Sequence, residues 1–269
     1  MHTIRAFLEI IKIEFKEDLQ YTFALMTSVI IQPIILLINI ALFTSVYAYN
    51  NTTQILGYDL GQMIWYMTSA HFIWVLIFNF TDFRISDRVL TGDLNMDLLR
   101  PLSLFKYELG ISIGFRLTAF FTEFIPGLII YSLIYFPSFM SWLSILKFCL
   151  LVQFSFLIMY MLNFLTGLSA FKLQNNASIT GIKVILMSIF GGSAIPLEFF
   201  PLPVRQVLAF LPFEYVFYWP IQFFLNTRTS QGVFVFLRVA GLQSMWVVLL
   251  YGLCRFFWKK SSRDFSAVG

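Results

Sequence analysis

This chain contains six runs of mostly apolar residues, and each run is about as long as a membrane-crossing helix. A helix needs roughly 20 apolar residues to cross a hydrocarbon layer about 30 Å thick. Hydrophobic residues make up 59% of the chain and charged residues only 12%, too little charge to cover so much apolar surface in water. We therefore predict a single-domain, all-α integral membrane protein over residues 1–269, with six transmembrane helices at residues 21–47, 63–80, 117–136, 144–171, 179–195 and 233–258.

The distribution of Lys and Arg predicts the orientation of these helices. Cytoplasmic connections of membrane proteins are enriched in basic residues. Most of the 18 Lys and Arg fall in the two terminal segments and in the second and fourth connections, whereas the outer connections hold only Lys147, Arg205 and Arg228. Both termini are therefore expected in the cytoplasm, which agrees with an even number of spans. The expected location is the plasma (inner) membrane of a bacterium.

The first 20 residues form an amphipathic segment rather than a span. Apolar side chains recur there at helical spacing, and charged side chains such as Arg5, Glu9 and Lys12 occupy the other side. Such a helix is expected to lie along the cytoplasmic membrane interface. The alternative is a solvated amphipathic helix packed on a partner. The apolar positions are Ile4, Phe7, Leu8, Ile11, Phe15 and Leu19.

A proline-rich apolar segment at residues 196–230 lies between the fifth and sixth spans. Its prolines forbid one long helix, yet the segment is too apolar for a free loop. Irregular backbone at membrane depth is tolerated only when protein shelters it or when it lines a wet cavity. We therefore predict an outer re-entrant helical segment. Its prolines are Pro196, Pro201, Pro203, Pro212 and Pro220.

The connection at residues 81–106 is the most polar part of the chain. It holds four basic and four acidic residues, and residues 93–102 read "DLNMDLLRPL", which predicts a short amphipathic helix suited to a protein partner. This segment resembles the type-2 ABC exporter permeases, which carry a charged pair, a Gly and an "LLRPLS"-like run after their second span. The matching residues here are Asp87, Arg88, Gly92, Leu98, Leu99, Arg100, Pro101, Leu102 and Ser103, and Asp97 lies within the same helix.

The resemblance covers nearly the whole chain, including the amphipathic start and the outer re-entrant segment. It implies that residues 81–106 contain a coupling helix that sits in a cleft of a separate ATPase subunit. It also implies a permease dimer, of two identical or homologous chains, bound to two ATPase subunits. The chain has no Gly-x-x-x-x-Gly-Lys-Ser/Thr phosphate loop, so ATP and Mg are expected in the ATPase partner. No cofactor or metal bound by this chain is expected, and scattered basic residues make nucleic acid an unsuitable partner.

Charged residues within or near the spans are candidates for a role in gating. Glu123 lies inside the predicted third span, with Arg116 two turns earlier, and the two could form a latch between conformations or a static ion pair. In the outer segment, Glu198, Arg205 and Glu214 could form a hydrated gate or be ordinary loop charges.

The predicted function is export of an amphipathic, lipid-linked or drug-like substrate, with membrane lipids as further partners. One alternative is an ion-gradient-driven secondary transporter, which would need carboxylates at mid-membrane and an internal repeat. Only Glu123 comes near the first requirement. Another alternative is an intramembrane enzyme, for which the two histidines and the absence of a catalytic constellation are unfavourable.

Overall fold

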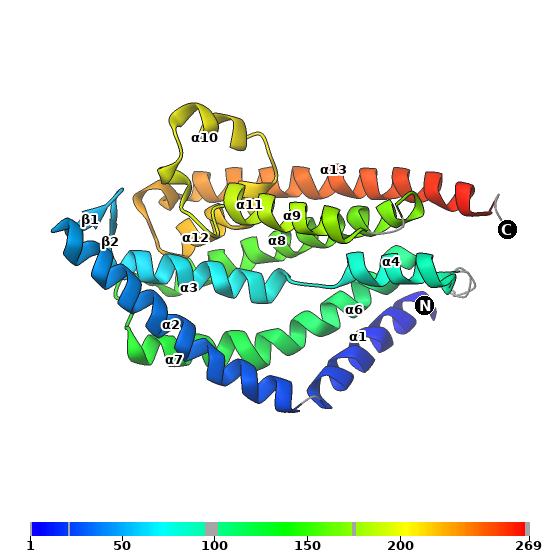
Figure 1. The fold of residues 1–269 in the computed structure, drawn as a ribbon, viewed down its shortest axis with the longest axis horizontal. Helices are drawn as coiled ribbons and strands as arrows, with labels where there is room; N and C mark the ends of the chain where they lie inside the picture. The colour runs from blue at the N-terminus through cyan, green and yellow to red at the C-terminus, as the bar shows by residue number, and fades with distance from the viewer. Residues whose placement is uncertain (1, 21, 95–101, 174–175, 267–269) are drawn as a thin grey trace.

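The computed structural model describes residues 2–20, 22–94, 102–173 and 176–266. Long helices run mostly along one direction of the molecule, and the N-terminus lies toward the same end as the C-terminus (Figure 1). The described helices include α1 (His2–Gln20), α2 (Thr22–Asn50), α3 (Leu60–Ile77), α4 (Thr81–Thr91), α6 (Leu104–Ala119), α7 (Ile125–Ile134), α8 (Trp142–Leu168), α9 (Ala177–Phe190), α10 (Leu202–Leu208), α11 (Phe213–Val216), α12 (Tyr218–Phe224) and α13 (Val233–Ser266).

Within the described residues, five helical segments are long and apolar enough to cross a membrane, which supports an all-α membrane protein. A sixth is possible if the bent pair Leu202–Leu208 and Phe213–Phe224, which turns by 76°, counts as one span. Helix α9 is apolar but only 14 residues long, or about 21 Å at 1.5 Å per residue. The five segments are Ile30–Asn50, Leu60–Thr91, Leu104–Ile134, Trp142–Phe171 and Val233–Ser261.

Three boundaries differ from the sequence-based expectation. The helix expected from residue 117 begins at Leu104, because Glu108 near its start pairs with arginines inside the protein instead of facing water. Part of the polar connection expected at residues 81–106 is itself helical, as α4. The fifth expected span, residues 179–195, ends as α9 at Phe190, where Gly191 and Gly192 turn the chain.

A short hairpin links α2 to α3, and the sequence analysis did not predict it. Its strands, β1 (Gln54–Ile55) and β2 (Tyr58–Asp59), are antiparallel, with Ile55 opposite Tyr58. Leu56 and Gly57 both have positive φ, as a tight two-residue hairpin turn requires. Asp59 then caps α3 by accepting a hydrogen bond from the Gln62 backbone, which fixes where this helix begins.

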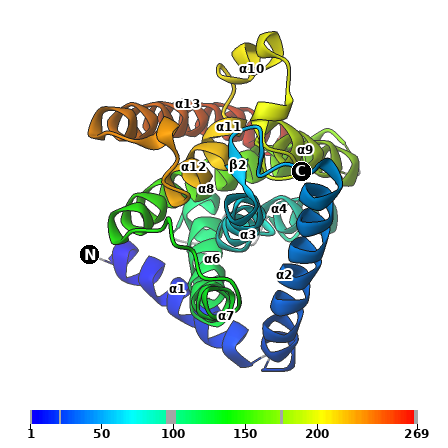
Figure 2. The ribbon, with the colours of Figure 1, turned by 90° about the vertical axis from the view of Figure 1, so that its left-hand side faces the viewer.

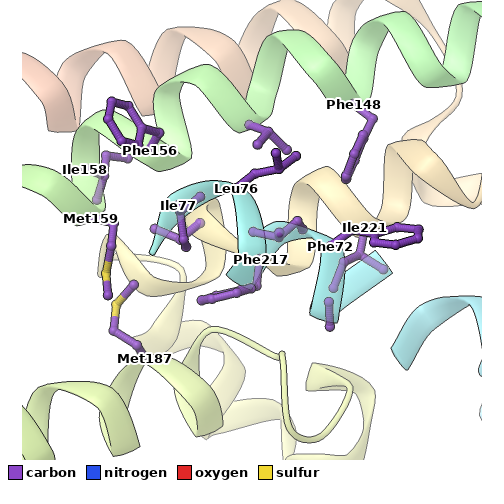
Figure 3. Packing of buried hydrophobic residues seen from close by; sticks show 14 of the residues in the cluster. Phe72, Leu76, Ile77, Phe148, Phe156, Ile158, Met159, Met187, Phe217 and Ile221 are labelled. Atoms are coloured by element: carbon purple, nitrogen blue, oxygen red, sulfur yellow. The ribbon is translucent and has the colours of Figure 1, made fainter. Parts of the chain in front are cut away.

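Helix α8 lies at the centre of the bundle, where α3, α4, α12 and α13 pack around it. Figure 2, a view along the long direction, shows α8 between α13 and the α3–α4 pair, while α2 and α1 lie at the periphery. The core between α3, α8, α9 and α12 is filled by large apolar side chains (Figure 3). Those labelled include Phe72, Leu76, Phe148, Met159, Met187, Phe217 and Ile221.

Helix α1 packs lengthwise against α6 through two glycines. A Cβ atom on Gly114 would lie 2.6 Å from the Glu14 Cβ and 2.9 Å from the Ile11 carbonyl oxygen, and one on Gly110 would lie 3.0 Å from Ile10. The Gly-x-x-x-Gly spacing therefore forms a groove that lets the two helices approach closely. Ile4 and Leu8 remain exposed beside this contact, as expected of a helix that also touches lipid.

Candidate functional site

A buried carboxylate joins the two helices that flank residues 92–103. Glu108 of α6 is fully buried, and its two oxygens accept hydrogen bonds from Arg84 Nε at 2.8 Å and Arg88 Nη1 at 2.6 Å. The two arginines are four residues apart on α4 and therefore share one face of that helix. We call Glu108, Arg84 and Arg88 the carboxylate clamp. It connects α4 to α6, and these two helices flank residues 92–103.

Neighbouring polar groups complete the clamp. The Thr81 and Ser112 hydroxyls lie 3.0 Å apart, and Arg84 Nη2 reaches both oxygens at 3.4 Å. The Arg88 guanidinium also lies 5.1 Å from the centre of the Tyr107 ring, within cation–π range. A buried ion pair is costly to form unless hydrogen bonds satisfy its remaining groups. The Thr81 and Ser112 hydroxyls and the Tyr107 ring provide these additional contacts for the two arginines.

A second ion pair ties the start of α4 to α9. Lys183 Nζ lies 2.5 Å from Asp82 Oδ2, and the same oxygen accepts a hydrogen bond from the Thr180 hydroxyl at 3.1 Å. The Asn176 side chain donates to the Asp82 backbone carbonyl at 3.0 Å. Helix α4 is therefore held by charge to both α6 and α9.

The break between α3 and α4 is also held from within. Asn163 of α8 donates to the backbone carbonyl and the side-chain oxygen of Asn79, both at 3.0 Å, and it accepts a hydrogen bond from Lys183. Gly167 allows close approach here, because a Cβ on it would lie 2.9 Å from Ile85. Residues 78–80 therefore form a junction fixed to α8, with α3 on one side and α4 on the other.

Two acidic residues of α1 lie near the clamp. Burial raises the pKa of the Glu14 carboxyl, Asp18 raises it further, and Arg84 opposes the shift. Burial likewise raises the pKa of the Asp18 carboxyl, while a hydrogen bond from Thr118 opposes the change. Asp18 Oδ2 is buried with no hydrogen-bond partner within the part of the chain that the structure describes. Both carboxyls therefore hold a proton more tightly than exposed ones do.

The structure describes some of the residues that were predicted to couple the permease to the ATPase. Asp87 is exposed on α4, Arg88 belongs to the clamp, and Gly92 ends α4 with φ +82°, a left-handed conformation that favours glycine. Ser103 directly precedes α6, and Leu102 is buried. The predicted residues Asp97, Leu98, Leu99, Arg100 and Pro101 lie outside the described residues.

Arg116 and Glu123 have separate surroundings in this structure, so whether they act together as a latch stays a prediction. Arg116 turns toward α8, where it donates to Gln153 Oε1 at 2.9 Å and to the Val152 carbonyl at 3.4 Å, and its guanidinium lies 4.5 Å from the Phe156 ring centre. Glu123 lies in a groove beside α3 instead. Two helical turns, about 10 Å, separate the pair, and a π-helical turn at Phe120–Phe124 rotates Glu123 away from the face of Arg116.

Within the described residues, the predicted gate residues Glu198, Arg205 and Glu214 form no ion pair with one another. Glu198 accepts a hydrogen bond from the Tyr218 hydroxyl at 2.6 Å, and Glu214 accepts one from Trp219 Nε1 at 3.1 Å. Within the described residues, the ion pairs do not include Arg205. Each carboxylate has an aromatic donor, but Glu198 Oε2 is buried without a hydrogen-bond partner in the described part of the chain, so whether the three residues act as a gate stays a prediction.

Hydrogen bonds join α3 to residues 192 and 193, just before the outer segment, and join β2 to α12 within it. Tyr66 donates to the Gly192 carbonyl at 2.6 Å, and Trp74 Nε1 donates to the Ser193 hydroxyl at 3.1 Å. Gln222 of α12 donates to the Tyr58 hydroxyl at 2.5 Å. These bonds hold the broken segment against the rest of the protein, and its re-entrant course in the membrane stays a prediction.

Sequence reasoning did not select Glu108, Lys183 or Asn163 as site residues. A signal for Glu108 was present, since it is a lone acid in an otherwise apolar helical run. The arginines of α4 were interpreted as topology signals, and their pairing depends on how α4 packs against α6. That packing is a tertiary feature with no local sequence signature.

The model of one protein family, described as "ABC-2 family transporter protein", matches residues 34–269 of the chain. This match covers the carboxylate clamp, the polar connection and the outer segment. A comparison with curated proteins finds no match.

Proposed function

Because the chain belongs to the ABC-2 family of transporter proteins, and is thus a transmembrane permease of an ABC transporter, we propose that it couples ATP hydrolysis in separate subunits to export. Two permeases, identical or homologous, would bind two ATPase subunits, which would hold ATP and Mg. Residues 92–103 would be the docking segment. The substrate would be an amphipathic, lipid-linked or drug-like molecule.

The observation that carries this proposal is the carboxylate clamp. Residues 92–103 join α4 to α6, and Glu108 fixes these two helices to each other immediately beyond that segment. Asp82 and Lys183 extend the connection to α9. A push on residues 92–103 would therefore move α4 and α6 together and reach α9, instead of being absorbed by a loose loop.

The proposed topology has six spans, with both termini cytoplasmic in a bacterial inner membrane. Helix α9 would be a short fifth span, and residues 196–230 would return to the outer face without crossing. The arrangement in Figure 1 supports this, because α9 lies alongside α8 and the chain then passes through α10–α12 before α13 runs back to the end where the N-terminus lies. Helix α1 would rest at the cytoplasmic interface with its exposed apolar edge toward lipid.

Charge reversal in the docking segment tests the proposal. Asp97→Lys and Arg100→Glu should reduce ATP-dependent transport and co-purification with the ATPase while leaving the permease folded. Arg228→Glu, which reverses an exposed charge within the outer segment, is the matched control. If both docking variants bind the ATPase and hydrolyse ATP like the parent, the docking assignment is wrong. Transport that follows an ion gradient without ATP would support the secondary-transporter alternative.

A further inference from the structure

A carboxylate opens into an aromatic groove beside the candidate membrane span Leu104–Ile134. The groove lies between α3 and the α6–α7 helix, has a volume of about 230 Å³ and is lined by Trp74, Val75, Phe78, Phe115, Ala119 and Glu123. A cavity of about 150 Å³ already accepts a benzene molecule. Glu123 lies eleven residues before the end of α7, which places it about 16 Å from that end.

Glu123 is half-buried and has neither an ion pair nor a hydrogen bond within the described residues. Its oxygens are not among the fully buried atoms that lack a partner, and Glu123 is one of the residues that line the groove. It also lies on the π-helical turn Phe120–Phe124. Such turns interrupt a helix at a cost and are frequent at functional sites. An acid at this depth is expected to meet a cation, water or a proton.

The remaining lining favours a particular kind of cation. Phe78, Phe115 and Trp74 present aromatic surface beside the carboxylate, and aromatic rings attract substituted ammonium groups through cation–π interaction. A small metal ion would need several oxygen ligands, which the groove does not offer. From this charge complementarity we propose that the groove binds the cationic head of an amphipathic organic cation, with its apolar tail along the neighbouring lipid-facing surface. This inference rests on the proposed export function and names its substrate class.

The groove lies at one end of a seam that leads to the carboxylate clamp. Glu108, Ser112, Phe115 and Ala119 share one face of α6 at helical spacing. Along this seam, Glu108 pairs with Arg84, Ser112 meets Thr81, and the Phe115 ring lies 6.0 Å from that of Phe80. Phe80 in turn lies 4.8 Å from Phe78 of the groove, measured between ring centres. The α3–α4 junction therefore contributes to the groove wall, so a bound cation would be sensed at the clamp.

A binding experiment with three matched amphiphiles tests this assignment. Radiolabelled decyltrimethylammonium, decyl sulfate and decyl maltoside share one tail and differ in charge. Each is titrated below its micelle concentration onto the permease–ATPase complex in lipid nanodiscs. The groove should bind the cation at least tenfold more tightly than the other two. Glu123→Gln should remove that preference, and Glu123→Asp should retain it, whereas Glu9→Gln, which removes an exposed acid of α1, should change nothing.

A second variant keeps the carboxylate and fills the space. Ala119→Leu should weaken cation binding at least tenfold even though Glu123 is unchanged. The proposal would be overturned if all three amphiphiles bind equally, or if Glu123→Gln binds the cation as tightly as the parent does. Equal binding is the result expected if Glu123 is protonated. Basal ATP hydrolysis by the same complexes is recorded in parallel. If the complex hydrolyses ATP but shows no cation preference, only the proposed cation binding in the groove is refuted. If the parent permease does not associate with an ATPase, the proposed export function is refuted.

Discussion

Replacement of Glu108 by glutamine should loosen the joint between α4 and α6. Removing one partner of a buried ion pair typically costs 3–5 kcal/mol, because the other charge is left buried. Here the arginine side chains are 25% and 18% exposed, so water can partly hydrate them once Glu108 is neutral. We therefore expect a loss of about 2–3 kcal/mol in the free energy of unfolding, somewhat below the range for fully buried pairs.

The assay is equilibrium unfolding of the purified permease in mixed micelles, with Glu9→Gln as the control for a lost exposed charge. Combining Glu108→Gln with Arg84→Gln should cost clearly less than the sum of the two single changes, because both act on one contact. The same Glu108→Gln complex should hydrolyse ATP with reduced coupling to transport. A Glu108→Gln permease as stable as Glu9→Gln, or fully additive effects in the double variant, would refute the clamp.

Three further predictions test the packing of α1 and the topology. Gly114→Val should detach α1 from α6, since the added atoms would overlap the Glu14 side chain; faster amide hydrogen exchange in α1 would show this, and unchanged exchange would contradict it. Because folding raises the pKa of Asp18, the protonated side chain contributes stability at low pH, and this contribution is lost as pH rises through the folded pKa. Asp18→Asn should therefore stabilise α1 at neutral pH and flatten the pH dependence of its amide hydrogen exchange. Equal exchange profiles in the two proteins would argue against burial of this acid. Single cysteines at the exposed positions Gln206 and Asn226 should both react with an impermeant thiol reagent from outside, whereas reaction of Asn226 only from the cytoplasm would add a crossing.

The sequence predicted those features that depend on local composition. The long spans follow from apolar runs, and the packed, broken outer segment follows from the prolines at residues 196–230. The start of α6 was predicted too late because Lys106, Glu108 and Arg116 interrupt the apolar run before residue 117. Glu108 and Arg116 are compatible with a packed helix because α4 and α8 supply their partners, whereas Lys106 is exposed.

The site was less accessible to sequence reasoning. Arg116 and Glu123 were paired because seven residues place them on one face of a regular helix, but the π-helical turn changes that register. No simple residue pattern predicts such a turn. The partner of Glu108 comes from a different helix, and the partner of Asp82 is about a hundred residues away in the chain. Long-range pairs of this kind appear only when the helices are placed in space.

The central claim is that a separate ATPase acts on this permease through the segment between α4 and α6. The most direct test places the photoreactive residue p-benzoylphenylalanine at Arg100 in the assembled transporter, with the same residue at Arg228 as the control. We predict a light-dependent cross-link to the ATPase subunit from position 100 and none from position 228. A transporter that forms and hydrolyses ATP but cross-links only from position 228, or from neither position, would contradict the account.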